Sequence, residues 1–388
     1  MTDGASPCVV CGETSQRPFL EIKGIPANCS TLWSTAAEAL GAPRGDLRLT
    51  HCSTCSLVRN AAFDSRLIGY DQLYDNSLNF SAAFRAYEQA TAHQLSERWK
   101  VGPASQVLEI GCGKGEFLTT LCDLTGASGI GFDPSYVPTG SEPRRIRFVV
   151  DVYDERHQSE RPDLIVCRHV LEHLDDPKAV LQSLRRALSS QPDAGLYVEV
   201  PDATHLFASD DMWDLIYPHC SYFDESALGA LLVGTGFDIL DTGSSFGGQF
   251  LYAHARPAHS MKSPPLAGAA ARDLVCGFAD RFGERVDTWA DRLEEARNEG
   301  QRVAIWGAGA KCNTFVNVVP GADAVSKVVD ANPRKVGTYL AGSGQRVDSP
   351  DSLAGDAPNL VVAMNPVYLP EIERSLAVLA PGARTVPV

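Results

Sequence analysis

The stretch that decides the fold occupies residues 107–118 and reads Val-Leu-Glu-Ile-Gly-Cys-Gly-Lys-Gly-Glu-Phe-Leu. Four strand-forming residues lead into Gly111, Gly113 and Gly115, and a helical pattern follows. Glycine has no Cβ, so a strand that ends in such a turn lets the backbone approach a ligand closely at the helix start. The next apolar run ends at Asp133, whose carboxylate can accept hydrogen bonds from two ribose hydroxyls. The pattern predicts a nucleoside-cofactor site.

Two acidic residues narrow the choice among nucleoside cofactors. The dinucleotide fingerprint Gly-x-Gly-x-x-Gly requires glycine at position 116, and this chain has Glu116. Glu109 places a second acid beside the turn, where it would repel a pyrophosphate and attract a cationic sulfonium. In these residues the chain resembles the class I S-adenosylmethionine-dependent methyltransferases, whose first motif is E/D-x-G-x-G-x-G. An ordinary strand, turn and helix with incidental glycines is the simpler alternative.

Composition and charge exclude several classes of protein. Of 388 residues, 44% are hydrophobic and 21% are charged, as in ordinary globular proteins of two or three domains. The net charge of −14 disfavours nucleic acid or an anionic membrane as a partner. No run approaches the ~20 apolar residues of a membrane span. Eleven cysteines without a secretory-signal pattern lead us to expect a reducing, cytoplasmic location.

Four cysteines form two C-x-x-C pairs near the N-terminus, Cys8 with Cys11 and Cys52 with Cys55. Together they supply the four thiolates of a tetrahedral structural zinc site. Such a site has no open coordination position, so the metal would stabilise the fold and take no part in catalysis. Two vicinal redox pairs are the alternative, although the sequence around them lacks a thioredoxin-like pattern.

The central part of the chain alternates strands and helices, which predicts a doubly wound, mainly parallel sheet with its ligands at the C-terminal strand ends. We expect helices over 172–189 and 224–235, with Asp175 or Asp176 as a cap before Pro177. The last two strands should pair antiparallel. The expected strands are 107–111, 129–133, 147–152, 164–169, 196–201, 237–243 and 249–256.

Further units flank this sheet. Residues 61–100 are predicted to be mostly helical, and a long amphipathic helix is predicted over 267–298. Aromatic residues of the first segment are expected to pack in the core: Tyr70, Tyr74, Phe80, Phe84 and Tyr87.

A second Rossmann-like α/β unit should follow the long helix, with strands at 302–306, 326–330, 359–364 and 383–387. Its Gly307-x-Gly309 turn is weak evidence for a second cofactor, because Cys312 stands where the third glycine should be. We therefore divide the chain into a four-Cys zinc domain (1–65), a cofactor domain with N-terminal helices (66–257) and a C-terminal helix plus Rossmann-like domain (258–388).

This order of units resembles the sugar C-methyltransferases that act on nucleotide-linked 4-keto-deoxysugars in antibiotic biosynthesis. The resemblance covers essentially the whole chain. It implies S-adenosylmethionine as cofactor, a structural zinc, and a small-molecule substrate such as a nucleotide sugar. In this fold Gly111, Gly113 and Gly115 approach the methionyl part of the cofactor, Asp133 holds the ribose, and Asp151 lies near the adenine. Its further anchors in this chain are His169-Val-Leu-Glu-His173, Pro218-His219-Cys-Ser-Tyr222-Phe223, Gly247-Gly248 and Trp306-Gly-Ala-Gly-Ala-Lys311.

The chain departs from that family at two positions. The family typically carries Glu-His before its Ser-Tyr-Phe, where this chain has Pro218 and His219. It also tends to carry Asn four residues before the histidine that follows the fourth strand, where this chain has His169. The first change removes a carboxylate that could orient the base.

The candidate catalytic residues follow two strands of the central sheet. His169 ends the fourth strand and His173 begins the next helix, while His219 lies in a long loop after the fifth strand. For the first two, a core histidine bonded to a backbone carbonyl is the alternative. With a pKa near ~6.5, His219 can remove the proton α to a ketone. His173 or Tyr222 would then donate to the enolate oxygen, and the carbanion would be methylated.

Three other functions fit parts of the sequence. An N- or O-methyltransferase acting on another natural-product scaffold needs a base only for an amine or hydroxyl, and Pro218 favours it. A noncatalytic protein that binds the cofactor is the second. An NAD-dependent dehydrogenase is the third, and Glu116 and Cys312 disfavour it.

Overall fold

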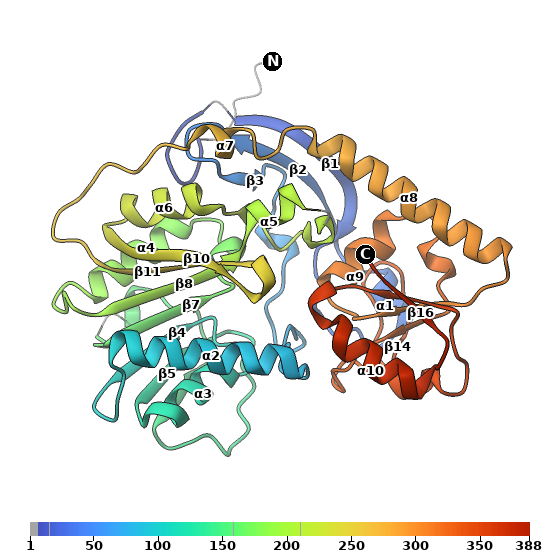
Figure 1. Cartoon of the computed structure of the whole chain (residues 1–388). Helices are drawn as coiled ribbons and strands as arrows, with labels where there is room; N and C mark the ends of the chain where they lie inside the picture. Colours follow the sequence, from blue (N-terminus) through green and yellow to red (C-terminus); the bar gives the residue numbers. More distant parts are fainter. Residues whose placement is uncertain (1–6, 15, 158, 210) are drawn as a thin grey trace.

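The computed structural model describes residues 7–14, 16–157, 159–209 and 211–388. Three β-sheets organise it (Figure 1). A seven-stranded sheet lies on the left of the view and a five-stranded sheet on the right. A four-stranded sheet arches above and between them, with the helix α8 (Phe278–Asn298) beside it.

The seven-stranded sheet has the order β10-β11-β8-β7-β4-β5-β6. Strands β4 to β8 and β10 run parallel, and β11 pairs antiparallel with both β8 and β10. This confirms the doubly wound sheet and its closing antiparallel hairpin. The strands are β4 (Gln106–Ile110), β5 (Ser128–Phe132), β6 (Ile146–Val149), β7 (Leu164–Arg168), β8 (Gly195–Pro201), β10 (Phe237–Ser245) and β11 (Phe250–Pro257).

Helices cover both faces of this sheet because successive strand residues point to opposite sides. Val107 and Val166 pack under α2 (Ala82–Trp99) and α3 (Glu116–Thr125). Leu108 and Ile165 pack in the core that contains α4 (Pro177–Ala187) and α6 (Glu225–Gly234). Asp176 caps α4 by accepting from the Ala179 amide at 3.0 Å, as predicted for one of the two aspartates.

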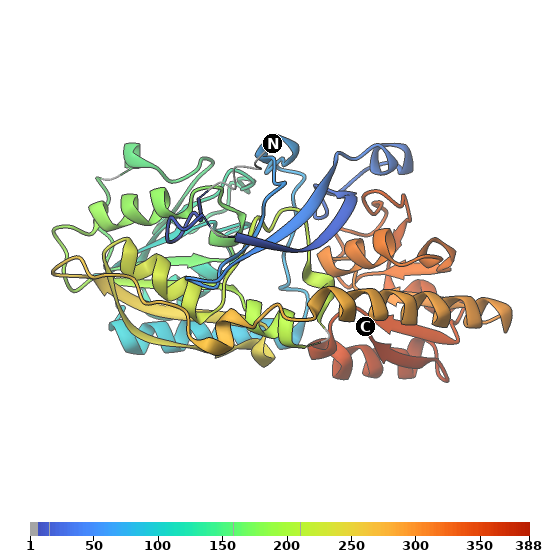
Figure 2. The same cartoon turned by 90° about the horizontal axis from the view of Figure 1, so that it is seen from above.

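The N-terminal sheet takes strands from two distant parts of the chain. Its order is β1-β2-β3-β9, all antiparallel. The first three strands are β1 (Gln16–Pro26), β2 (Arg44–Cys52) and β3 (Val58–Asn60), and β9 is Ser221–Tyr222, which begins two residues after His219. The long β1–β2 hairpin, with α1 (Ala36–Leu40) at its tip, reaches across to the C-terminal unit (Figure 2).

The C-terminal unit is a five-stranded parallel sheet of order β14-β13-β12-β15-β16. Its parallel pairing confirms a second Rossmann-like domain. The strands are β12 (Val303–Trp306), β13 (Lys327–Val329), β14 (Val347–Asp348), β15 (Leu360–Ala363) and β16 (Arg384–Pro387), with α9 (Ala310–Val318) and α10 (Leu369–Leu379).

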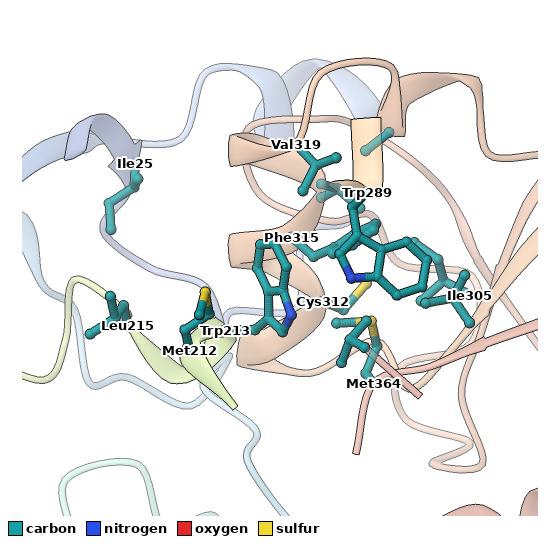
Figure 3. Packing of buried hydrophobic residues seen from close by; sticks show 14 of the residues in the cluster. Ile25, Met212, Trp213, Leu215, Trp289, Ile305, Cys312, Phe315, Val319 and Met364 are labelled. Atoms are coloured by element: carbon teal, nitrogen blue, oxygen red, sulfur yellow. The ribbon is translucent and has the colours of Figure 1, made fainter. Parts of the chain in front are cut away.

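One hydrophobic core joins the three units. Trp213, in the loop after β8, is fully buried with its ring 5.0 Å from that of Phe315 on α9 (Figure 3). Trp289 of α8 packs on the other side of Phe315 at 5.3 Å. The same cluster includes Ile25 of β1 and Ile305 of β12. The apolar packing therefore fixes the loop that carries His219 against the C-terminal domain.

Three helix predictions were wrong in part. Residues 61–80 are irregular apart from the short turn Ser65–Leu67, because Asp64, Asp71 and Asp75 each accept amides two residues ahead and so favour turns over helix. Helix 172–189 is interrupted at Leu174, which is extended. Helix 267–298 is divided into α7 (Ala269–Arg272) and α8 by Gly277, whose φ of 65° is left-handed. Strand β14 was missed because it has two residues.

Candidate active site

The glycine loop after β4 is built as the sequence predicts, with positive φ at Gly111, Gly113 and Gly115. A Cβ at Gly111 would lie 2.2 Å from Val170 Cγ2, so the loop is in contact with the turn that carries the histidines. A Cβ at Gly113 would meet no atom within 4 Å. Space for a ligand is therefore open directly over Gly113, where the backbone can be approached most closely.

Asp133 and Glu109 flank this loop. Asp133 accepts from the Gly113 amide at 2.8 Å and from the amide and hydroxyl of Ser135 at 2.7 and 2.6 Å. Glu109 is 3% exposed, and its Oε2 has no hydrogen-bond partner within the described part of the chain. Burial raises the pKa of Glu109 to about 8. An amino-acid ammonium would give that oxygen its missing partner, so these residues fit S-adenosylmethionine.

Asp151 lies beyond the end of β6 and is engaged by its own turn. It accepts from the Val152 amide at 2.8 Å and pairs with Arg156 at 2.9 Å. Its neighbours Val150 and Val152 are 48% and 56% exposed, which is unusual for large aliphatic side chains at a strand end. They form an exposed apolar surface on both sides of Asp151, the residue that the sequence analysis expected near the adenine.

A buried ion network lies beneath the site, and sequence reasoning missed it. Arg168 pairs with its registered neighbour Glu199 on β8 at 2.9 Å and with Glu88 of α2 at 3.3 Å. The guanidinium lies over the Phe117 ring at 4.3 Å. Glu199 is fully buried and also accepts from the hydroxyls of Tyr87 and Tyr197. The sequence did carry a signal for this network: Arg168 and Glu199 are charged residues near the ends of apolar strands, on the same face of the sheet as Glu109.

His169 lies between two carboxyl groups at the end of β7. Its φ is 55°, a left-handed conformation that is strained for a residue with a side chain. Its Nε2 is 3.1 Å from Glu199 Oε1, and its Nδ1 is 3.7 Å from Glu172 Oε1. Burial alone would lower the pKa of His169, but these two carboxylates raise it to about 9. His169 is therefore protonated at neutral pH.

His173 and His219 form a neutral pair. Their ring centroids are 4.8 Å apart. His173 Nδ1 lies 2.9 Å from the Tyr70 hydroxyl and 3.0 Å from the Pro218 carbonyl oxygen. Burial lowers the pKa of His173 to about 4 and that of His219 to about 3. Tyr70, which was expected only to pack, is thus a polar residue of the site.

Tyr222 is brought next to His219, with ring centroids 5.9 Å apart. Its hydroxyl donates to the Ile216 carbonyl at 3.3 Å, and its ring packs against Phe207 at 5.9 Å. These contacts use the proton that the sequence analysis expected Tyr222 to donate to an enolate. His169 remains a candidate donor at this edge, whereas the neutral His173 uses its one N–H on the Pro218 carbonyl.

The four N-terminal cysteines converge as predicted. Cys8 Sγ lies 3.6 Å from Cys55 Sγ, and Cys11 Sγ lies 3.5 Å from Cys52 Sγ. A zinc tetrahedron with Zn–S distances of ~2.3 Å has edges of about 3.8 Å, and a disulfide measures ~2.05 Å. Both of these contacts join one C-x-x-C pair to the other, so the four thiols form a single cluster, which fits a shared metal better than two separate redox pairs. The donor set and its spacing are compatible with a structural zinc.

Sequence comparisons agree with this architecture. The family described as "Methyltransferase domain" matches residues 81–242, and "C-methyltransferase C-terminal domain" matches residues 262–387. The C-methyltransferase NovU of Streptomyces niveus is 27% identical over 94% of this chain and 90% of its own length. The fold and the cofactor loop define an S-adenosylmethionine-dependent methyltransferase. Within that class, the chain is similar along nearly its whole length to a C-methyltransferase, and it carries the C-terminal domain of such enzymes.

Solved structures are similar over about half of the chain. A 1,6-didemethyltoxoflavin-N1-methyltransferase of Burkholderia thailandensis has a TM-score of 0.36 and 20% identity, covering 45% of this chain and 79% of its own. The magnesium protoporphyrin IX methyltransferase of Synechocystis PCC 6803 has a TM-score of 0.35 and 20% identity, covering 48% and 91%. None of the helices in the described ranges combines the length and apolarity needed to cross a bilayer.

The raised pKa of His169 predicts a pH-dependent stability. Its folded-state pKa of about 9 exceeds the ordinary value of ~6.5. The stabilisation is therefore complete below pH ~6.5 and is lost as the pH rises through about 9. Urea unfolding of the wild type should show a free energy that falls over this range. In His169→Asn, which tolerates the left-handed backbone, this part of the slope should vanish. An identical slope in both proteins would contradict the assignment.

Proposed function

We propose that this C-methyltransferase methylates a carbon next to a ketone in a nucleotide-linked deoxysugar during natural-product biosynthesis in the cytoplasm. The observation that carries the proposal is the neutral pair of the half-buried His173 and the buried His219. His173 lies on the turn that contacts the cofactor loop through Val170 and Gly111. A carbon acid needs a neutral base and a stabiliser for the enolate oxygen. The pair, with the protonated His169 nearby, offers both.

The glycine loop would hold S-adenosylmethionine over Gly113, with Glu109 at its amino group, Asp133 at its ribose and Val150 and Val152 beside its adenine. When bound, the cofactor supplies an electrophilic methyl group. The chain's own residues position the acceptor and move one proton. His219, neutral because it is buried, takes the proton from carbon, and the protonated His169 donates to the oxygen.

The nucleotide-sugar substrate rests on the resemblance in domain order and on the similarity to NovU along nearly the whole chain. Pro218 favours a second candidate, an N- or O-methyltransferase on another natural-product scaffold, because it lacks the carboxylate that would assist a carbon base. Such an enzyme would not exchange carbon-bound hydrogen of a ketone substrate with solvent.

Cofactor binding tests the glycine site. Calorimetry should show that S-adenosylhomocysteine binds and that NAD does not. Asp133→Ala should weaken S-adenosylhomocysteine binding by ~1.5–3 kcal/mol, the value of a hydrogen bond to a charged group. The matched control is Asp123→Asn on the exposed side of α3, which should bind as the wild type does. Binding of NAD in place of S-adenosylhomocysteine would refute the cofactor assignment.

Removing the proposed base should separate catalysis from binding. His219→Asn should reduce methyl transfer to a thymidine-diphosphate-linked 4-keto-6-deoxyhexose by at least ~100-fold, as expected for loss of a general base. Its affinity for S-adenosylhomocysteine should stay within a factor of two or so, because His219 follows β8 and not the cofactor loop. Unchanged turnover would remove His219 from the mechanism.

We also propose that Cys8, Cys11, Cys52 and Cys55 hold one structural zinc. Elemental analysis should find one zinc per chain in the wild type. Cys8→Ser should lose both the metal and a cooperative unfolding transition, because metal binding and folding of such a unit are coupled. Cys276→Ser, at an exposed cysteine outside the cluster, is the control. A folded Cys8→Ser protein that keeps its zinc would exclude the assignment.

A further inference from the structure

Two buried polar groups at the histidine pair, the Glu172 carboxyl group and Nδ1 of His219, have no hydrogen-bond partner among the described residues. Glu172, in the turn η3 (Leu171–His173), is 1% exposed, and neither carboxyl oxygen makes a hydrogen bond to any described residue. His219 is 7% exposed, and its Nδ1 is likewise unpaired within the ranges described. Burying a carboxyl group or an imidazole without a hydrogen bond is costly, so such groups mark a function when they lie together.

The geometry pairs these two groups. Glu172, His173 and His219 each offer one polar atom, and the three atoms lie within 4.8 Å of one another. His173 already uses its Nδ1 on Tyr70 and on the Pro218 carbonyl. On its other side Glu172 faces the His169 ring at 3.7 Å. Among the ring nitrogens of His173 and His219 in the described ranges, Nδ1 of His219 is the buried one without a hydrogen-bond partner, and we therefore assign it to Glu172.

We propose that Glu172 is the positioning residue of the base: its carboxylate accepts from Nδ1–H of His219 and leaves Nε2 free to take the substrate proton. This inference rests on the proposed function and deepens it. Pro218, beside the base, has no side chain that could do this, and its carbonyl is engaged by His173. The required carboxylate comes instead from the turn after β7.

The proton-transfer step balances within the chain. The bond between the carbon α to the ketone and its hydrogen breaks, and the electron pair becomes that of the enolate. The proton forms a new bond to Nε2 of His219, which becomes an imidazolium. The Glu172 carboxylate stabilises that charge, and the proton later leaves to solvent. The cluster, with one polar atom of each residue within 4.8 Å of the others, is compatible with this role, because catalytic hydrogen bonds often tighten only when the substrate is bound.

The same three side chains could instead hold a divalent cation, since two imidazoles and a carboxylate form a common ligand set. The charges around the turn favour the role in proton transfer over binding of a divalent cation. Glu172 already faces the protonated His169, and Glu199 is neutralised by Arg168. A second metal per chain is therefore an outcome that the experiment must be able to detect.

Hydrogen exchange isolates the base step from methyl transfer. With S-adenosylhomocysteine bound, the wild type in D₂O should exchange the α hydrogen of a thymidine-diphosphate-linked 4-keto-6-deoxyhexose for deuterium from the solvent. Loss of the corresponding signal in proton NMR measures this exchange. Glu172→Gln should slow this exchange and methyl transfer by about 100-fold or more. Glu172→Asp should recover part of the rate. Asp175→Asn, at an exposed aspartate three residues along that pairs with Arg59, should behave as the wild type.

Cofactor affinity and the KM for the sugar should hardly change in Glu172→Gln, because a positioning role acts on the rate of proton transfer. Nitrogen NMR of His219 in the wild type gives a test that needs no Glu172 variant, with the signal assigned by its loss in His219→Asn. The proposal expects the proton on Nδ1 in the neutral ring, and a proton on Nε2 would overturn it.

The outcomes distinguish a failure of the proposed function from a failure of the role assigned to Glu172. A wild type that neither exchanges nor methylates the keto sugar contradicts the proposed function, and the tautomer of His219 still decides the role of Glu172. Wild-type exchange that persists unchanged in Glu172→Gln contradicts this inference alone. A second metal ion per chain, absent from Glu172→Gln and required for exchange, would show that the cluster is a metal site and would also overturn it.

Discussion

The buried ion pair between Arg168 and Glu199 is the interaction on which the site depends. These residues are registered neighbours at the ends of β7 and β8, and Glu88 of α2 and the Phe117 ring of α3 enclose the guanidinium. A pair this deeply buried is costly to desolvate and costlier to break. The pair is stable because each partner makes several contacts, and the hydroxyls of Tyr87 and Tyr197 donate hydrogen bonds to Glu199.

The consequence of that pair is a fixed electrostatic environment at the carboxyl end of the sheet. One oxygen of Glu199 lies against both Arg168 and His169. Together with Glu172, Glu199 raises the pKa of His169 and keeps its imidazole protonated, although burial alone would lower that pKa. Farther along the same edge, His173 and His219 have carbonyl, hydroxyl and ring contacts and stay neutral. Histidines at one edge of the sheet thus have different charge states, because His169 lies between two carboxylates while burial dominates at His173 and His219.

Features of the site that depend on residues close together in the sequence could be predicted, whereas features that depend on contacts between distant segments could not. The glycine turn, Asp133 and the four cysteines carry local patterns in which the spacing of residue types already states the geometry, and the structure brings each set together. The network around Arg168 could not be read in the same way, because it depends on lateral register between strands separated by about 30 residues and on which helix covers the face. Tyr70 was assigned to packing for a related reason. Its segment folds as irregular turns, so the helical periodicity used to orient it does not apply.

Strand topology also explains how a catalytic carboxylate can be supplied from different parts of a chain. In a parallel sheet the loops after neighbouring strands converge at one edge, so a group on the loop after β7 and a group on the loop after β8 reach the same volume. Here the loop after β8 is held against the C-terminal domain through Trp213 and Phe315, and the turn after β7 is held against the cofactor loop through Val170. With both loops anchored, the position of His219 relative to Glu172 is set by packing and not by their separation in sequence. A proline beside the base is then compatible with an acid-assisted mechanism, since chemistry depends on where the carboxylate lies and not on which loop carries it.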